Sequence, residues 1–138
     1  MSFQLLPTFQ KKTKICDLKL SSVIMEDKEF PWLLLIPRVA DVVQMNQLSE
    51  QDQLQLMKEI NFCSSIMEEL FECDRLNVAA IGNKTPQLHV HIICRTEKDS
   101  LWPETVWGQP MTRLSQEEND ARADKIRKKF EEKVGELI

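Results

Sequence analysis

The sequence predicts a single α+β domain with an antiparallel sheet flanked by helices. Two short apolar segments, 21–26 and 30–36, lie on either side of a polar turn, and the longest amphipathic pattern begins only after Ser49. Strands and helices are mixed without a regular β-α-β alternation, which favours antiparallel pairing. The 138 residues contain no repeat, low-complexity segment or internal linker, so we expect residues 1–138 to form one domain.

The first predicted elements form a β-hairpin. Residues 21–26 alternate weakly between polar and apolar side chains, and Asp27-Lys28-Glu29 reads as a polar turn. The apolar run 30–36 is closed by Pro37. Such a run is too short for a stable helix and is typical of a central strand.

A connection and the longest helix follow the hairpin. Residues 39–48 form the connection, and Ser49 stands three residues before Asp52, the spacing of an N-cap followed by an acidic first turn. Apolar side chains then recur at helical intervals until about Cys73. We interpret this Met- and Phe-containing stripe as the core-facing side of the helix, not as a cofactor site.

Two more strands are predicted on either side of a turn. Residues 77–81 form the first strand, and the Gly, Asn and Pro of 82–86 form the turn. In the second strand, 87–95, polar and apolar side chains alternate over the first six residues.

The last part of the chain predicts an irregular segment and then a closing helix. Tryptophan and proline crowd into 102–108, which excludes a regular helix there. Ser115 and Glu118 have the spacing of a capping box, so an amphipathic helix is expected at about 115–134.

Charge and hydropathy exclude several classes of partner. The net charge is −4, so the surface as a whole has no attraction for a nucleic-acid backbone, and any phosphate site must be local. No apolar run approaches the roughly 20 residues that span a bilayer, and the first residues do not have the pattern of a secretory signal. We therefore expect a cytoplasmic protein with neither nucleic-acid nor membrane partners.

The four cysteines are widely spaced and lie in or beside apolar segments. They are Cys16, Cys63, Cys73 and Cys94, with no C-x-x-C pair among them. The paired spacing of a zinc site is absent. We expect reduced, mostly buried thiols and no metal centre.

The two histidines carry the chemistry that the sequence suggests. Period-two geometry places Gln87, His89 and His91 on one face of their strand, about 7 Å apart along it, with apolar residues on the other face. Three interpretations stay open: histidines that are solvated or bonded to backbone, a metal pair without an obvious third ligand, or work on a phosphate. A neutral imidazole is a nucleophile near pH 7, and a protonated neighbour donates to phosphoryl oxygens.

Residues 87–93, Gln-Leu-His-Val-His-Ile-Ile, resemble the signature of the histidine triad (HIT) superfamily, His-φ-His-φ-His-φ-φ with φ apolar and Gln in the first slot. Residues 33–38 look like the family's second-strand segment, which ends in Pro and a basic residue. A long helix, a strand and a Gly-Asn turn follow in the family's order. Residues 102–108 are similar to a bacterial subgroup with Gln-x-His-x-His, and the resemblance covers about 16–108.

This resemblance implies a homodimer that acts at the α-phosphate of a nucleotide through a covalent nucleotidyl-histidine. The substrate would be a dinucleoside polyphosphate or a nucleoside phosphoramidate, hydrolysed or transferred without a cofactor, with Mg²⁺ only as a companion of a polyphosphate. His89 would be the nucleophile, His91 would contact the phosphate, and Gln87 would orient the site. The alternative, favoured by Gln87 and Trp32, is a catalytically weak nucleotide-binding or regulatory module.

Three further residues are candidates for substrate binding. Asn83 precedes Gln87 by four residues, where many relatives place an amide close to the scissile bond. Lys84 would meet a phosphate as a point charge, or lie in solvent as a turn lysine. Trp32 replaces a histidine of several relatives, and its ring would stack on a base or belong to the core. Arg95 is expected at the surface or in a salt bridge.

Overall fold

The computed structural model describes residues 2–137 and contains one five-stranded sheet of order β1-β2-β3-β5-β4. Every neighbouring pair of strands is antiparallel. The strands are β1 (Thr13–Asp17), β2 (Ser21–Met25), β3 (Trp32–Pro37), β4 (Arg75–Ala79) and β5 (Val90–Arg95). The helices are α1 (Pro7–Gln10), η1 (Met45–Gln47), α2 (Glu50–Leu70), α3 (Gln116–Lys133) and η2 (Val134–Leu137). The predicted α+β fold is confirmed.

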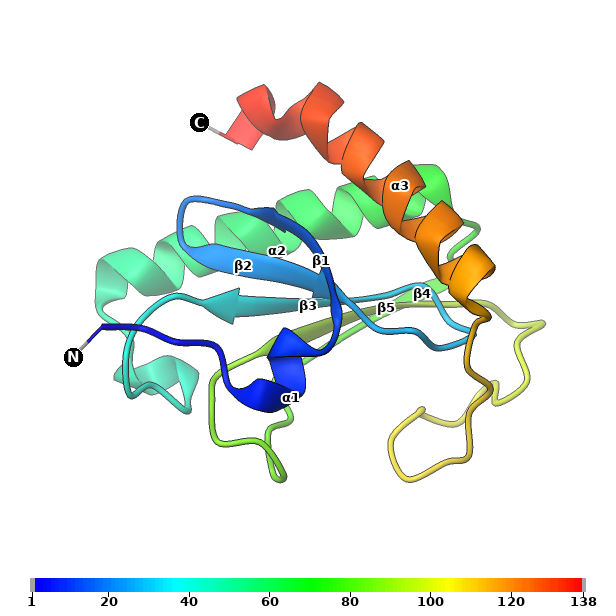
Figure 1. Ribbon diagram of the computed structural model, residues 1–138, viewed down its shortest axis with the longest axis horizontal. Coiled ribbons are helices and arrows are strands. Elements are labelled where there is room, and N and C mark those ends of the chain that lie inside the picture. Colours follow the sequence, from blue (N-terminus) through cyan, green and yellow to red (C-terminus); the bar gives the residue numbers. More distant parts are fainter. Residues whose placement is uncertain (1, 138) are drawn as a thin grey trace.

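The two long helices cover one face of the sheet, and the short α1 lies on the other side (Figure 1). Between the sheet and these long helices is a core that includes Val23, Leu33, Val90 and Ile92 from the strands. A second core on the opposite face contains Phe9, Trp32 and Ile93, among others. All residues of β3 and β5 are buried, because both faces of the sheet centre are covered.

The predicted hairpin and helix starts are confirmed. Strands β2 and β3 pair with Met25 opposite Leu33. The Ser49 hydroxyl accepts a hydrogen bond from the amide of Asp52 at 3.1 Å, and α2 ends at Leu70, earlier than expected. Ser115 and Glu118 form the reciprocal capping box at the start of α3.

Strand ends and two early elements differ from the prediction. β4 begins and ends two residues earlier than 77–81, and β5 starts at Val90, three residues after Gln87. α1 and β1 were not predicted, because both are short and neither shows a clear apolar period. β1 is an edge strand, and its burial pattern is mixed.

The structure pairs two of the cysteines, Cys73 and Cys94, whose Cα atoms lie 5.2 Å apart. The sequence did not predict this pairing. A separation of 21 residues gave no hint of this contact, which arises because the loop after α2 returns against β5. Cys16 and Cys63 are free thiols. Burial raises the pKa of Cys16 to about 12, so this thiol stays protonated at neutral pH.

Within residues 2–137, no helix combines the length and apolar character needed to cross a membrane.

Candidate active site at His89 and His91

The two histidines lie at the start of β5, on the α1 side of the sheet. β5 lies between β3 and β4, and His91 is opposite Leu34 on one neighbour and Ala79 on the other. His89 immediately precedes the strand and packs against Phe9. Leu88, Val90 and Ile92 belong to the core under the long helices, which confirms the predicted division of faces.

The ring of His89 is fixed in one tautomer by its backbone neighbour. Its Nδ1 lies 2.6 Å from the carbonyl oxygen of Gln87. A carbonyl only accepts hydrogen bonds, so Nδ1 carries the proton and Nε2 presents a lone pair. The side chain of His89 is 6% exposed, and Phe9 meets its ring edge-on at 4.9 Å between centroids. The ring is therefore held on two sides, and its Nε2 has no hydrogen-bond partner among the described residues.

His89 lines a cavity of about 590 Å³. The other lining residues come from the loop after β3 and from the turn before β5: Val43, Gln44, Met45, Asn46, Ala80, Gly82, Asn83, Pro86 and Leu88. Asn83 is thus brought to the same cavity as His89, as expected. Lys84 is exposed in the turn and is not one of the lining residues. His89 is the one titratable side chain in this lining.

Gly82 makes room for the ring of His89. A Cβ at this position would lie 3.2 Å from Cε1 of His89 and 3.2 Å from the carbonyl oxygen of Thr85. Both distances are tighter than ordinary van der Waals contact, and one neighbour is backbone. Any side chain here would push on the imidazole.

His91 is occupied at both ring nitrogens. The indole N–H of Trp32 donates to Nδ1 at 3.1 Å, and Nε2 lies 3.1 Å from the carbonyl oxygen of Ile81. Nε2 must therefore carry the proton, and the ring is neutral. The pKa of His91 is lowered from 6.5 to about 4. Burial is the main cause, the hydrogen bond to Ile81 opposes it, and the nearby His89 and Lys12 act in the same direction as burial.

The predicted phosphate contact of His91 is therefore not supported. Its two nitrogens are already bonded inside the protein, and the ring does not line the cavity in front of His89. A neutral imidazole without a free N–H has nothing to donate to a phosphoryl oxygen.

Trp32 belongs to the second core and is 4% exposed. Its ring lies against His91 and meets Trp107 edge-on, at 6.4 Å between centroids. Because its faces are covered, base stacking by this ring is excluded in this structure. Of the two predicted roles for Trp32, the core position is the correct one.

The amide of Gln87 is directed away from the cavity in front of His89. Its Oε1 accepts the backbone N–H of Leu6 at 3.0 Å, and its Nε2 donates to the carbonyl oxygen of Gln4 at 2.8 Å. Gln87 lines a separate cavity of about 200 Å³ beside the N-terminal residues. A hydrogen bond from this amide to a phosphate is therefore not available in this arrangement.

Sequence reasoning missed Phe9, Gly82 and the loop 43–46. The Gly-Asn pair at 82–83 signalled a turn but not the contact with His89. Phe9 lies in an N-terminal stretch without periodicity, and 43–46 is a connection whose side chains reach the cavity only through the fold.

Arg95 was predicted to lie at the surface or in a salt bridge. It forms a salt bridge, and it is buried. It is 1% exposed, and its Nε and Nη2 bond the carboxylate of Asp99 at 2.7 and 3.0 Å. Its guanidinium also lies over the ring of Phe30 at 5.1 Å. Its charge is therefore balanced internally, outside the cavity of His89.

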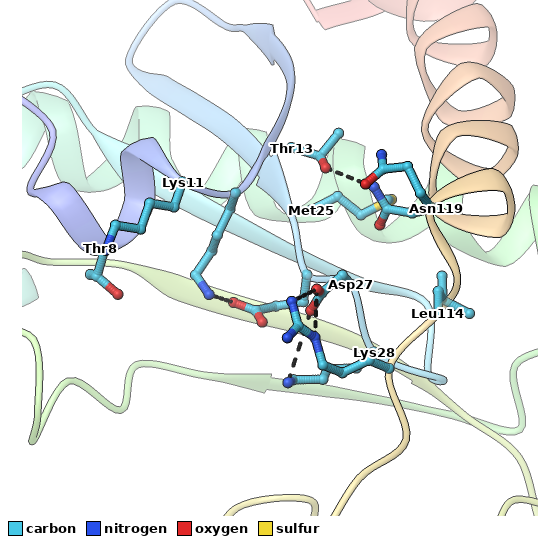
Figure 2. Close-up of a pocket in the computed structure, with 12 residues that line it drawn as sticks. Thr8, Lys11, Thr13, Met25, Asp27, Lys28, Leu114 and Asn119 are labelled. Atoms are coloured by element: carbon cyan, nitrogen blue, oxygen red, sulfur yellow. Dashed lines mark hydrogen bonds and ion pairs between the residues drawn. The ribbon is translucent and has the colours of Figure 1, made fainter.

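A second cavity, of about 520 Å³, lies between α1, the β2–β3 turn and the start of α3 (Figure 2). Its charges are largely paired with one another: Lys12 contacts Glu26 at 2.5 Å, and Arg113 contacts Asp27 at 2.5 Å. Neither histidine lines it. These ion pairs tie the N-terminal region to the segment before α3, a structural role.

No group of three or more histidine, cysteine or acidic side chains is placed to hold a metal ion in the part of the chain that the structure describes. His91 has a partner within the protein at each ring nitrogen, and His89 has one at Nδ1.

The sequence and the fold are similar to those of known proteins. Residues 9–98 match the family model described as HIT domain. A histidine triad protein from Bradyrhizobium japonicum is 40% identical, with 94% of this chain and 98% of that chain covered and a TM-score of 0.87. One from Marinobacter aquaeolei is 34% identical over 96% and 98% of the two chains, with a TM-score of 0.88.

A third, from Sinorhizobium meliloti, is 31% identical over 92% of this chain and 96% of that one, with a TM-score of 0.86. Among curated proteins, no sequence matches the chain.

Proposed function

Because this chain belongs to the histidine triad family, whose members are generally nucleotide-binding hydrolases and transferases, we propose that it cleaves a nucleotide at its α-phosphate through a covalent intermediate on His89. The observation that carries the proposal is the 2.6 Å contact from Nδ1 of His89 to the carbonyl of Gln87. It places the ring proton on Nδ1 and leaves Nε2 as the nucleophile at the wall of the cavity.

The proposed reaction has two displacements. The Nε2 lone pair of His89 forms a bond to the α-phosphorus, and the bond from phosphorus to the leaving group breaks with its electron pair. The imidazole then carries a positive charge, which the Gln87 carbonyl stabilises through the Nδ1–H bond. Water next attacks phosphorus, the P–N bond returns its electrons to Nε2, and the proton of the water goes to solvent. An acceptor other than water gives transfer.

The cavity favours a leaving group that departs without a proton. Its lining offers no titratable side chain besides His89. His91 is neutral with both nitrogens bonded, and Gln87 has no proton to give. We therefore propose a polyphosphate leaving group, as in a dinucleoside polyphosphate, ahead of the amine of a phosphoramidate. The attack by His89 needs no metal, and Mg²⁺ would accompany the polyphosphate.

The nucleoside would lie along the loop 43–46, where Val43 and Met45 are 41% and 40% exposed and line the cavity. Apolar side chains at a cavity wall suit a flat base. Asn83 lines the same cavity, and its amide would act as a hydrogen-bond donor and acceptor close to the phosphate of the nucleotide. Lys84, exposed in the same turn, would act only at long range as a point charge.

The experiment is to follow nucleotide products and the protein mass with a dinucleoside polyphosphate, for wild type and His89→Ala. We expect turnover and a nucleotidyl adduct on His89 in the wild type. The variant should lose at least about 1000-fold in turnover and still bind the nucleotide. Equal turnover in the variant would remove the nucleophile assignment.

A nucleotide-binding module without useful catalysis is the second candidate. The same lack of an acid in the cavity, together with the bonded nitrogens of His91, favours it. Binding of the nucleotide in the wild type without product or adduct would support this role.

We further propose a homodimer that meets along β4. This strand is at the edge of the sheet, with Val78 46% exposed and Ile81 37% exposed just beyond it. Unpaired strand edges with exposed apolar side chains commonly pair with another chain. Light scattering should give twice the monomer mass, and Val78→Lys should lower it. The net charge of −4 offers no basis for a nucleic-acid partner, and a cytoplasmic location fits a nucleotide substrate.

A further inference from the structure

The side chain of Gln87 holds the N-terminal segment, which we define as residues 4–9. Its amide accepts from Leu6 N–H at 3.0 Å and donates to the carbonyl of Gln4 at 2.8 Å. The two backbone groups flank Leu5, as they do when one strand pairs with another. A primary amide fits because it offers an acceptor and a donor in one plane, whereas a carboxylate only accepts.

The backbone of the same residue holds the reactive ring. The carbonyl oxygen of Gln87 lies 2.6 Å from Nδ1 of His89. Its own N–H donates to the carbonyl of Thr85 at 2.9 Å. A shift in the Gln87 backbone would therefore move the acceptor that fixes the tautomer of His89.

The N-terminal segment also reaches His89 directly. After Leu6 the chain forms α1, and Phe9 from this turn meets the His89 ring edge-on at 4.9 Å. Phe9 is 3% exposed. Gln10 closes the turn by donating from Nε2 to the carbonyl of Leu5 at 2.7 Å. α1 lies on the sheet side opposite the long helices (Figure 1).

We propose that Gln87 is a positioning residue: it binds the N-terminal segment through its side chain so that Phe9 and the Gln87 carbonyl together hold His89 with Nε2 toward the cavity. The importance of this orientation for turnover rests on the proposed function, but the orientation itself does not. The glutamine in the first slot of the motif thus acts through the chain's own first residues and not on the phosphate.

The chain has only two histidines, so ¹⁵N labelling of histidine gives two ring systems that can be followed separately. We expect the wild-type His89 ring to have its proton on Nδ1 and the His91 ring to have its proton on Nε2. In Gln87→Glu, a carboxylate faces the carbonyl of Gln4, and the segment should detach. His89 should then become a mixture of tautomers, while His91 keeps its signals.

Turnover is the second measurement. In Gln87→Glu, kcat should fall by about 10- to 100-fold, the cost of a displaced reactive group, while KM changes by less than about threefold, since Gln87 does not line the cavity in front of His89. Gln116→Glu is the control. Gln116 also donates from its amide, to the carboxylate of Asp120 at 2.8 Å, and it lies at the start of α3, outside the lining of the cavity in front of His89. It should leave both measurements unchanged.

Folding is checked by circular dichroism and thermal unfolding. If Gln87→Glu does not fold, Phe9→Leu tests the same contact with little loss of apolar volume and should give the same mixture of tautomers. An unchanged His89 tautomer with unchanged kcat in a folded variant would overturn the proposal. If the wild type forms neither product nor adduct, the proposed function fails, and the tautomer comparison still decides the positioning role.

Discussion

The indole N–H of Trp32 donates to Nδ1 of His91 at 3.1 Å, inside a core where Trp32 is 4% and His91 8% exposed. The pair joins β3 to β5, two residues from the imidazole of His89. It explains why the proposed chemistry falls to His89 and not to His91. The geometry also makes the protonation of each ring a measurable property.

Replacing the indole tests this pair. Trp32→Phe leaves Nδ1 of His91 without its donor and removes part of a buried ring, so the free energy of unfolding should fall by about 2–3 kcal/mol. The free nitrogen should take up a proton more readily, and the pKa of His91 should rise. Chemical denaturation and ¹⁵N titration measure the two effects. Trp102→Phe, outside the contacts of both histidines, is the control, and an unchanged His91 titration would contradict the assignment.

Acid should destabilise the protein through His91. In the unfolded chain this residue has its ordinary pKa of 6.5, and burial in the folded protein lowers it to about 4. Between these values the unfolded state binds more protons, so stability is fully present above pH 6.5 and falls as the pH drops toward 4, by up to about 3 kcal/mol. Denaturation of wild type and His91→Gln at pH 7 and pH 4.5 separates this loss from the carboxylates. Equal losses in both would refute it.

A methyl group at Gly82 should disturb the reaction more than the fold. A Cβ there would lie 3.2 Å from Cε1 of His89, and the backbone is outside the left-handed region, so alanine is allowed. We expect Gly82→Ala to lower kcat about 10- to 100-fold by displacing the ring. Gly135→Ala, where a Cβ meets nothing within 4 Å, is the control. Full turnover in Gly82→Ala would show that the ring has more room than this contact implies.

The rate should depend steeply on the leaving group. We expect kcat/KM for a dinucleoside polyphosphate to exceed that for a phosphoramidate of the same nucleoside by about 100-fold or more, because general acid catalysis typically contributes that much where it is present and the cavity lining holds no acid. A series of nucleotide aryl esters with graded phenol pKa measures this. A flat dependence would show that a group in the protein does protonate the leaving atom.

The strand pattern made much of the site predictable. Alternation around His89 and His91 correctly separated the face with the imidazoles from the face with Val90 and Ile92. The spacing of Ser49 and Asp52, and that of Ser115 and Glu118, correctly placed the starts of both long helices. These signals depend only on residues that are close together in the chain, so they can be recognised in the sequence.

The errors concern contacts between residues far apart in the chain. Gln87 bonds residues more than 80 positions away, and Trp32 meets His91 across 59 positions. A side chain that the sequence places on the same face as His89 still turns to whichever partner the tertiary packing provides. The pairing of Cys73 with Cys94 was missed for the same reason.

The position of β5 between β3 and β4 also bears on which parts of the candidate site can move. A strand hydrogen-bonded on both sides opens only with much of the sheet, so its amides should be among the slowest in the molecule to exchange with deuterium. His91 lies in this strand, and His89 immediately precedes it. For the proposed nucleotide, we therefore expect the movement that admits it to come from 43–46 and 80–86, while the imidazole of His89 stays in place.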